Sequence, residues 1–257
     1  MKTARRGQRA FTLVELSISC FLLGILLVVL ATALSDSQNL WRQTTGSSDA
    51  RQQLRRAQAS LERDMQFASA NFGITTVGPQ QGPGFAGDAF WFLSAEDGNT
   101  GELKRRFNGS PVYLRNVLYY LAMPAGDPCA GGSGPNGYDD RCPHNVLIRK
   151  TIDIGAPSSD ESNEEQLMTP AQVSVFLTRP SGPSVASMTS EANVKLASQA
   201  ARQMLWFRVR STLGPLQFEL RAVNIPRSRK EVATGTSSLY NSPLTSEIRM
   251  TLIPPNP

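Results

Sequence analysis

The chain has 257 residues and a formal net charge of +5, from 26 basic and 21 acidic side chains. Four of the basic residues fall within the first ten positions, where no acidic residue accompanies them, so the rest of the chain carries a net charge of only +1. The basic isoelectric point of about 9.4 is therefore no indication of nucleic-acid binding. The length allows one ordinary globular domain, and 17 prolines and 20 glycines predict many turns.

The first predicted element is an apolar helix over residues 11–34, in which Glu15 is the only charged residue. Its 24 residues would reach about 36 Å, enough to cross a bilayer. Basic residues precede this segment and the first charge after it is Asp36, so we expect a cytoplasmic amino terminus and an extracytoplasmic chain beyond it. A secretory signal peptide cleaved after Ala33 is the alternative, but the apolar run is longer than such signals have.

Glu15 lies five residues into the apolar helix. A carboxylate costs about 2.5 to 3.5 kcal/mol at the centre of a membrane-spanning helix, so it needs a partner charge or access to the membrane surface. Because Glu15 is close to the start of the helix, snorkelling of its side chain to the cytoplasmic interface is the alternative to pairing.

The basic leader MKTARRGQRA, which ends in the small residue Ala10, is followed by the string FTLVEL and the apolar helix. Together they resemble the amino termini of type IV prepilins and of the pseudopilins of type II secretion systems. The resemblance implies a leader peptide over residues 1–10, cleavage of the Ala10–Phe11 bond by prepilin peptidase, and N-methylation of Phe11. It further implies an inner-membrane protein whose freed helices join other subunits in a filament on a membrane assembly platform, with Glu15 neutralising the terminal ammonium of a neighbour.

Two features depart from the family pattern. The family usually has glycine before the cleaved bond, whereas this chain has Ala10, with Gly7 three residues earlier. Cleavage after Gly7 would leave three residues ahead of Phe11 and move Glu15 out of register, so Ala10–Phe11 is the predicted site. Major pilins also tend to carry a proline in the outer part of the apolar helix, but residues 11–78 contain none.

Beyond the membrane, residues 35–73 are predicted to continue the same helix. Apolar and small residues recur there at spacings of three, four and seven, while charged residues such as Asp64 fall largely on other faces. The stripe comprises Leu40, Thr44, Ser47, Arg51, Leu54, Leu61, Met65, Ala68 and Phe72. A kink at residues 46–49 is the alternative to a continuous helix. Gly73 is predicted to end the helix, because glycine is favoured just past a helix end.

Residues 74–257 are predicted to form a β-rich head. Strands are expected at residues 90–93, 112–123, 145–154 and 247–253, and a hairpin at 205–213 and 216–225. Residues 173–177 are a further strand candidate, whereas 190–203 favours a short helix. A long helix packed on an antiparallel sheet is an α+β arrangement. Its order matches the pilin fold, and the head is most similar to the minor pseudopilins of the J type and to W-type minor pilins.

The sequence contains no recognisable catalytic or cofactor motif. Its one histidine, His144, has no second histidine or nearby cysteine pair with which to bind zinc, and it is expected to be solvated. Neither a Gly-x-Ser-x-Gly elbow nor a glycine-rich phosphate loop is present. We therefore expect a structural protein without a cofactor rather than an enzyme.

Two of the three cysteines, Cys129 and Cys142, bracket a glycine-rich loop outside the membrane, and Cys20 lies within the apolar helix. In an oxidising compartment we predict a Cys129–Cys142 disulfide, which would stabilise the fold by about 3 kcal/mol; two free thiols are the alternative. Asp139 and Asp140 in this loop, with Asp127 before it, are candidate calcium ligands. The ligand order of an EF-hand is absent, however, so a solvated turn is favoured.

Three functional interpretations follow. The chain is a minor pilin or pseudopilin that primes or caps a filament, an abundant major pilin, or a membrane-anchored protein unrelated to fibres. The leader argues against the third interpretation. The bulky head and the absence of a helix proline favour a minor subunit over a major one. The expected partners are prepilin peptidase, other subunits, the assembly platform and, before assembly, the lipid bilayer; direct binding of nucleic acid is not expected.

Overall fold

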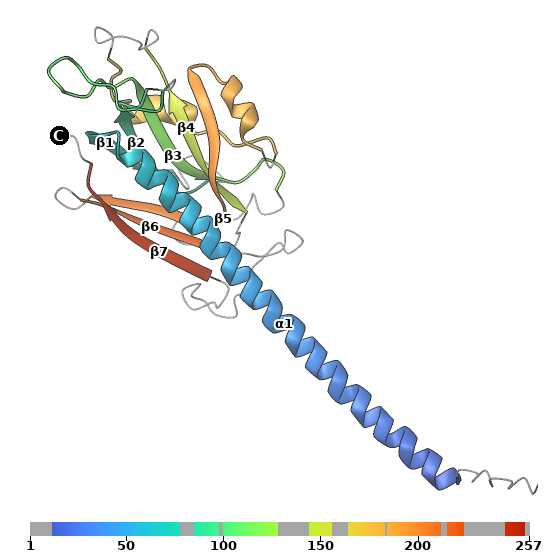
Figure 1. The fold of residues 1–257 in the computed structure, drawn as a ribbon. Coiled ribbons are helices and arrows are strands. Elements are labelled where there is room, and N and C mark those ends of the chain that lie inside the picture. The colour runs from blue at the N-terminus through green and yellow to red at the C-terminus, as the bar shows by residue number, and fades with distance from the viewer. Residues whose placement is uncertain are drawn as a thin grey trace, which may run out of the picture. The chain divides into compact units, whose positions relative to one another are not determined.

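The computed structural model describes residues 12–77, 85–97, 100–127, 144–155, 164–182, 184–211, 215–223 and 245–254. The helical elements within these ranges are α1 (Leu13–Met65), α2 (Pro170–Phe176) and the 3₁₀ turn η1 (Ala186–Ser190) (Figure 1). The strands are β1 (Ala68–Thr76), β2 (Phe85–Ser94), β3 (Arg115–Ala122), β4 (Asn145–Ile152), β5 (Val194–Ser211), β6 (Leu216–Val223) and β7 (Thr245–Leu252). The chain divides into two compact units, residues 1–45 and 46–257, and each is described by itself.

The long helix α1 is continuous, so the alternative of a kink at residues 46–49 is wrong. It ends at Met65, however, and not at Gly73. A turn follows, in which the Phe67 amide donates to the Asp64 carbonyl at 3.1 Å, and β1 then begins. The spacing of apolar residues suggested a longer helix, but β-branched residues at 74–76 favour a strand, and β1 pairs with β2 up to Thr76.

The seven strands form one antiparallel sheet in which each strand pairs with the next, in the order β1 to β7. The strand predictions at residues 90–93, 112–123, 145–154 and 247–253 are confirmed. The hairpin is confirmed as β5 and β6, with Phe207 opposite Leu220. The α+β prediction, a helix on an antiparallel sheet, is therefore correct.

The strand prediction at residues 173–177 is wrong, because most of this segment lies in α2. Thr169 caps the helix, and its backbone N–H donates to the Gln172 side chain at 2.8 Å while the Gln172 amide donates to the Thr169 hydroxyl at 3.4 Å. Pro170 occupies the first helical turn. These start signals outweigh the β-branched pair Val173 and Val175.

The helix predicted at residues 190–203 is also wrong. Only its first residue is helical, as the end of η1, and most of the segment belongs to β5, which pairs with β4 from Val194 onwards. The register of this pairing shifts three times, and Gln203 has a positive φ of 56°. Such irregularities interrupt the alternation of buried and exposed side chains, so the sequence pattern of a strand is lost although the pairing is made.

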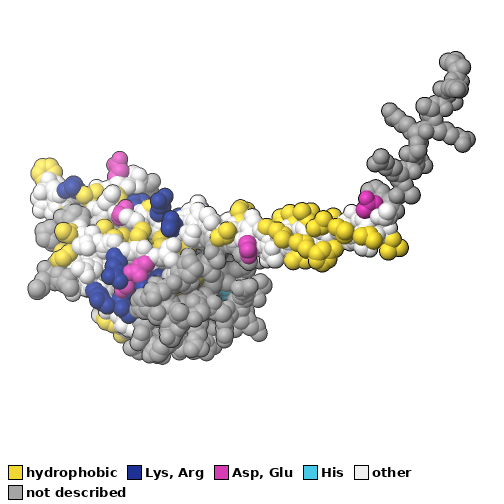
Figure 2. All heavy atoms as spheres, turned by 90° about the horizontal axis from the view of Figure 1, so that it is seen from below, with side chains coloured by type: hydrophobic (Ala, Val, Ile, Leu, Met, Phe, Trp, Pro, Cys, Tyr) yellow, Lys and Arg dark blue, Asp and Glu magenta, His cyan; other side chains and the backbone are white. Residues whose placement is uncertain are grey.

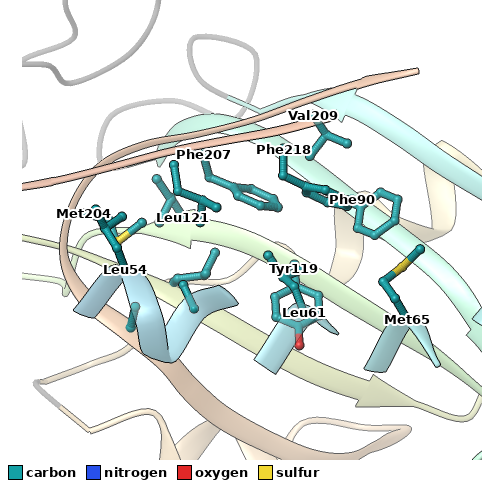
Figure 3. Packing of buried hydrophobic residues seen from close by; sticks show 14 of the residues in the cluster. Leu54, Leu61, Met65, Phe90, Tyr119, Leu121, Met204, Phe207, Val209 and Phe218 are labelled. Carbon is teal, nitrogen blue, oxygen red and sulfur yellow. The ribbon is translucent and has the colours of Figure 1, made fainter. Parts of the chain in front are cut away.

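Alternation along the strands gives the sheet two buried faces. Tyr119 on β3 lies in the core that packs against α1, whereas its neighbour Tyr120 lies in the core on the opposite face, against α2. Figure 3 shows the α1 side, where Leu54, Leu61 and Met65 point from the helix toward the aromatic side chains of the strands. The helix contributes Ala50, Leu54, Ala57, Leu61 and Met65 to this core.

The sheet is curled, which brings β2 close to β5 although they are not neighbours in it. The Val209 amide on β5 donates to the Asp88 carboxylate on β2 at 2.9 Å. Beside it Gly87 has φ +77°, and a Cβ there would lie 2.2 Å from the Phe207 carbonyl oxygen. Only glycine permits so close an approach.

Candidate functional site

The amino-terminal helix begins with a capping box formed by Thr12 and Glu15. The Thr12 N–H donates to Glu15 Oε2 at 2.9 Å, and the Glu15 N–H donates to the Thr12 hydroxyl at 3.3 Å. The Thr12 carbonyl accepts the first helical hydrogen bond, from the Leu16 N–H at 3.1 Å. Glu15 thus satisfies helix-start donors that lipid could not satisfy. The FTLVE string contains this Thr-x-x-Glu signature, which sequence reasoning did not use.

The segment Leu13–Gln38 is long and apolar enough to cross a membrane. Its 26 residues would span about 39 Å as a helix. Its large apolar side chains are exposed, as Figure 2 shows for this stretch of α1. The hydroxyls of Ser17, Ser19 and Thr32 donate to helix carbonyls three or four residues earlier at 2.8 to 2.9 Å. These three hydroxyls therefore have partners within the helix, as a lipid environment requires.

The predicted cleavage and methylation residues, Ala10 and Phe11, lie outside the described residues. Of the residues predicted to act in assembly, Glu15 is described. It lies in the first turn of α1 beside Thr12, whereas the ammonium with which it was expected to pair would belong to another subunit, so its role in assembly stays a prediction.

Within the head, a buried ion pair fastens α1 to the sheet. Both Nε and a terminal nitrogen of Arg149 on β4 donate to the Asp64 carboxylate, the latter at 3.0 Å. The Tyr119 hydroxyl on β3 donates to Asp64 at 2.7 Å. The Ser60 hydroxyl lies 2.8 Å from the same phenol oxygen and must be the donor there, because the phenol proton is already used. We call Ser60, Asp64, Tyr119 and Arg149 the helix clamp.

The Asp64 side chain is only 1% exposed, so its predicted place on an outward face is wrong. The sequence did contain a signal for the burial of Asp64. This residue follows Ala57 by seven residues and Leu61 by three, which is the spacing of the buried side chains of α1. Burial by itself lowers the pKa of Arg149, but hydrogen bonding to and attraction by Asp64 outweigh it and raise the pKa. Burial raises the pKa of Tyr119 well above its usual value. Arg149 therefore stays charged and Tyr119 stays neutral over the physiological pH range.

Lys150, next to Arg149 on β4, makes the corresponding link on the opposite face of the sheet. Its side chain is fully buried, and its ammonium donates to the Phe176 carbonyl at the end of α2 at 2.8 Å. It also bonds to the Glu191 carboxylate at 2.6 Å and the Thr178 hydroxyl at 2.7 Å. Burial lowers the pKa of Lys150, and Glu191 offsets only part of this effect. These contacts are those of a structural lysine, with every donor used.

His144 is not solvated, as the sequence suggested, but buried. Its Nδ1 lies 2.9 and 3.0 Å from the two carboxylate oxygens of Asp127, so this nitrogen carries the proton. The side chain is 5% exposed, and β4 begins at the next residue, Asn145. Asp127 and His144 line a cavity of about 1080 Å³. Asp127, one of the candidate calcium ligands, thus has a protein partner.

The other residues of that loop, Cys129, Cys142, Asp139 and Asp140, lie outside the described residues. In the part of the chain that is described, no three histidine, cysteine, aspartate or glutamate side chains come together as metal ligands. The disulfide therefore stays a prediction, and so does the solvated turn that was favoured over a calcium site.

Residues 5–31 match a family model described as the prokaryotic N-terminal methylation motif. The match covers 27 of the 257 residues and includes residues 5–10 of the predicted leader, the capping box and most of the apolar span. Comparison with curated proteins and with solved structures gave no match.

The motif is that of proteins cleaved by prepilin peptidase and then methylated at the new amino terminus. It stands here before an apolar membrane helix and an antiparallel sheet, and it points to a structural subunit rather than an enzyme. The matched segment and the α+β pilin-like fold together support placing the chain in the type IV pilin-like family.

Proposed function

We propose that the chain is a minor subunit that primes or caps a type IV pilus or a type II secretion pseudopilus. Prepilin peptidase cuts the Ala10–Phe11 bond, Phe11 is methylated, and the freed helix leaves the inner membrane to join other subunits at the assembly platform. The amino terminus faces the cytoplasm and the head lies outside the membrane. A basic leader before the span supports this orientation.

The observation that carries this proposal is one carboxylate at the start of an otherwise apolar span. Glu15 is the only charged residue in residues 11–34, and it is held by Thr12 at the first turn of α1. Cleavage at Ala10–Phe11 would create an ammonium four residues from Glu15 on each subunit. A capped carboxylate at a fixed depth can then receive the ammonium of a neighbour, which sets the axial stagger of the helices.

The minor role is supported by the size of the head unit, residues 46–257, and by the absence of proline from residues 11–78. A major pilin is the alternative, and counting subunits per filament by quantitative mass spectrometry would separate the two. The J-type or W-type assignment rests on resemblance of the head alone.

Mass spectrometry of the membrane-extracted protein tests the proposal directly. We expect a mature chain that begins with N-methylphenylalanine at position 11. An intact Met1 would contradict prepilin processing, and a chain beginning at Leu34 would identify a secretory signal instead. Cleavage after Gly7 would keep the family but remove the proposed pairing of Glu15.

A further inference from the structure

The connection between β2 and β3 ends in a tight turn that presents a fully exposed phenylalanine. Phe107 has 106% relative exposure, the largest among the described hydrophobic residues. The turn is well fixed: the Arg106 N–H donates to the Ser110 carbonyl at 2.8 Å, and the Gly109 N–H donates to the Arg106 carbonyl at 2.9 Å. Asn108 accepts from the Ser110 amide at 3.0 Å. The aromatic ring is therefore held out by a preorganised backbone.

Arg105 lies two residues before Phe107, at a bridge to Pro111. Its guanidinium reaches across the turn and donates to the Gly109 carbonyl at 2.8 Å, so it lies beside the turn that carries Phe107. Its next neighbour, Arg106, pairs with Glu164 at 2.5 Å, whereas Arg105 has no acidic partner within the ranges that the structure describes.

The turn lies at the end of the head where α1 finishes. The Ala95 amide, just after β2, donates to the Phe67 carbonyl just after α1 at 3.0 Å. The chain then leaves the sheet, and β3 re-enters opposite the same end of β2, with Arg115 facing Ser94. Figure 1 shows this green connection extending beyond the strands.

The surrounding charges indicate which class of partner fits. The connection over residues 95–114 carries three acidic and three basic side chains, and Glu164 adds a further carboxylate through its pair with Arg106. It therefore has no net positive charge with which to attract a membrane or nucleic-acid surface. An exposed aromatic ring beside a guanidinium instead suits a discrete protein pocket. Arginine and large aromatic side chains are the common anchors of protein interfaces, and a fixed turn loses little entropy on binding.

We propose that the Phe107 turn docks on the head of another pilin-like subunit of the same filament, in an apolar pocket with a carboxylate at its rim. Phe107 fills the pocket and Arg105 pairs with the carboxylate. The inference rests on the proposed function, because it needs a filament in which heads are stacked, and it names the contact that the head makes there.

The test uses the full chain, in cells that produce the complete assembly system. A photoreactive benzoylphenylalanine replaces Phe107, and in a matched control it replaces Val175, which is 72% exposed on α2. We expect irradiation at position 107 to give an adduct with a protein that carries the N-terminal methylation motif, and position 175 to give little. Adding Arg105→Glu should reduce the adduct roughly tenfold, equivalent to about 1.4 kcal/mol.

Phe107→Ala tests whether changes at this position disturb the fold. Because the Phe107 side chain is fully exposed, we expect its removal to leave leader cleavage and the midpoint of thermal unfolding unchanged. An adduct with lipid or nucleic acid, equal adducts at positions 107 and 175, or no effect of Arg105→Glu would overturn the docking proposal. If Phe107→Ala helices still cross-link through cysteines in their spans while position 107 gives no adduct, only the docking is wrong. An uncleaved leader in the parent chain would remove the proposed function, and the docking with it.

Discussion

Glu15 has two roles to separate, because its carboxylate caps α1 in its own chain and is proposed to receive an ammonium from a neighbour. Glu15→Gln separates them, since glutamine can still accept from the Thr12 N–H but carries no charge. We expect insertion, leader cleavage and head folding to survive in this variant and subunit joining to fail. Leaving a buried charge without its partner typically costs about 3 to 5 kcal/mol. Cross-linking between cysteines on neighbouring spans measures the joining.

Thr12→Ala is the matched control for Glu15→Gln. It removes the capping hydroxyl, which typically costs about 1 kcal/mol, but keeps the charge, so cross-linking should persist. If Glu15→Gln cross-links as readily as the parent chain, the carboxylate acts only as a cap and has no part in assembly.

Asp64 is expected to be the most sensitive charged residue of the head. Asp64→Ala leaves the buried Arg149 guanidinium with only the more distant Glu96 carboxylate, at 3.7 Å, as a counter-charge, and should destabilise the head by about 3 to 5 kcal/mol. The neighbouring Arg63→Ala changes a side chain that is 58% exposed and should cost less than about 1 kcal/mol. Urea unfolding in detergent, followed by near-ultraviolet circular dichroism, measures both. Equal shifts in the two variants would show that the clamp does not hold the helix to the sheet.

At the scale of elements, Gly73 is needed within a strand and not at the end of a helix. The sequence suggested a helix end there, whereas the structure places it in β1 opposite Trp91. A Cβ at position 73 would lie 2.1 Å from the indole ring, which donates its N–H to the Met168 carbonyl at 2.8 Å. We expect Gly73→Ala to destabilise the head by about 1 to 3 kcal/mol, since the ring must move.

Gly182→Ala is the control for Gly73→Ala, because a Cβ there meets nothing within 4 Å. Thermal unfolding in detergent compares the two variants. A midpoint for Gly73→Ala no lower than for Gly182→Ala would mean that the Trp91 ring can shift without loss.

Local signals decided which elements the sequence could predict. The continuous helix and the β5–β6 hairpin follow from composition and periodicity, which act within a few residues of each other. The end of α1 and the start of β5 do not, because pairing with β2 and β4 overrides the local preference. In the candidate site, Glu15 could be found from the sequence because it is the only charge in an apolar segment. Asp64 could be found because it has the spacing of the buried residues of α1. Arg149 could not be found, since its partner lies 85 residues away.

At the scale of the whole molecule, the contact between Asp127 and His144 bears on the Cys129–Cys142 prediction. Each cysteine is two residues from one member of this pair, and two residues span at most about 7 Å. The contact between Asp127 and His144 holds together the two ends of the segment that contains both cysteines, which favours the predicted bridge. Non-reducing peptide mapping should recover the cross-linked peptides, and reduction should lower the stability by about 3 kcal/mol. Alkylation of both cysteines without prior reduction would rule out the disulfide.

The unbroken course of α1 has a mechanical consequence. α1 runs from Leu13 to Met65, and its residues from Ala50 to Met65 form one wall of the core of the head. A pull along the helix axis therefore loads its contacts with the sheet in shear, so that many buried side chains and the clamp at Asp64 must slip together rather than peel one at a time. Within the head, resistance to extraction would come from the whole length of the seam, and a weakened clamp would lower the rupture force before it altered the shape of the protein.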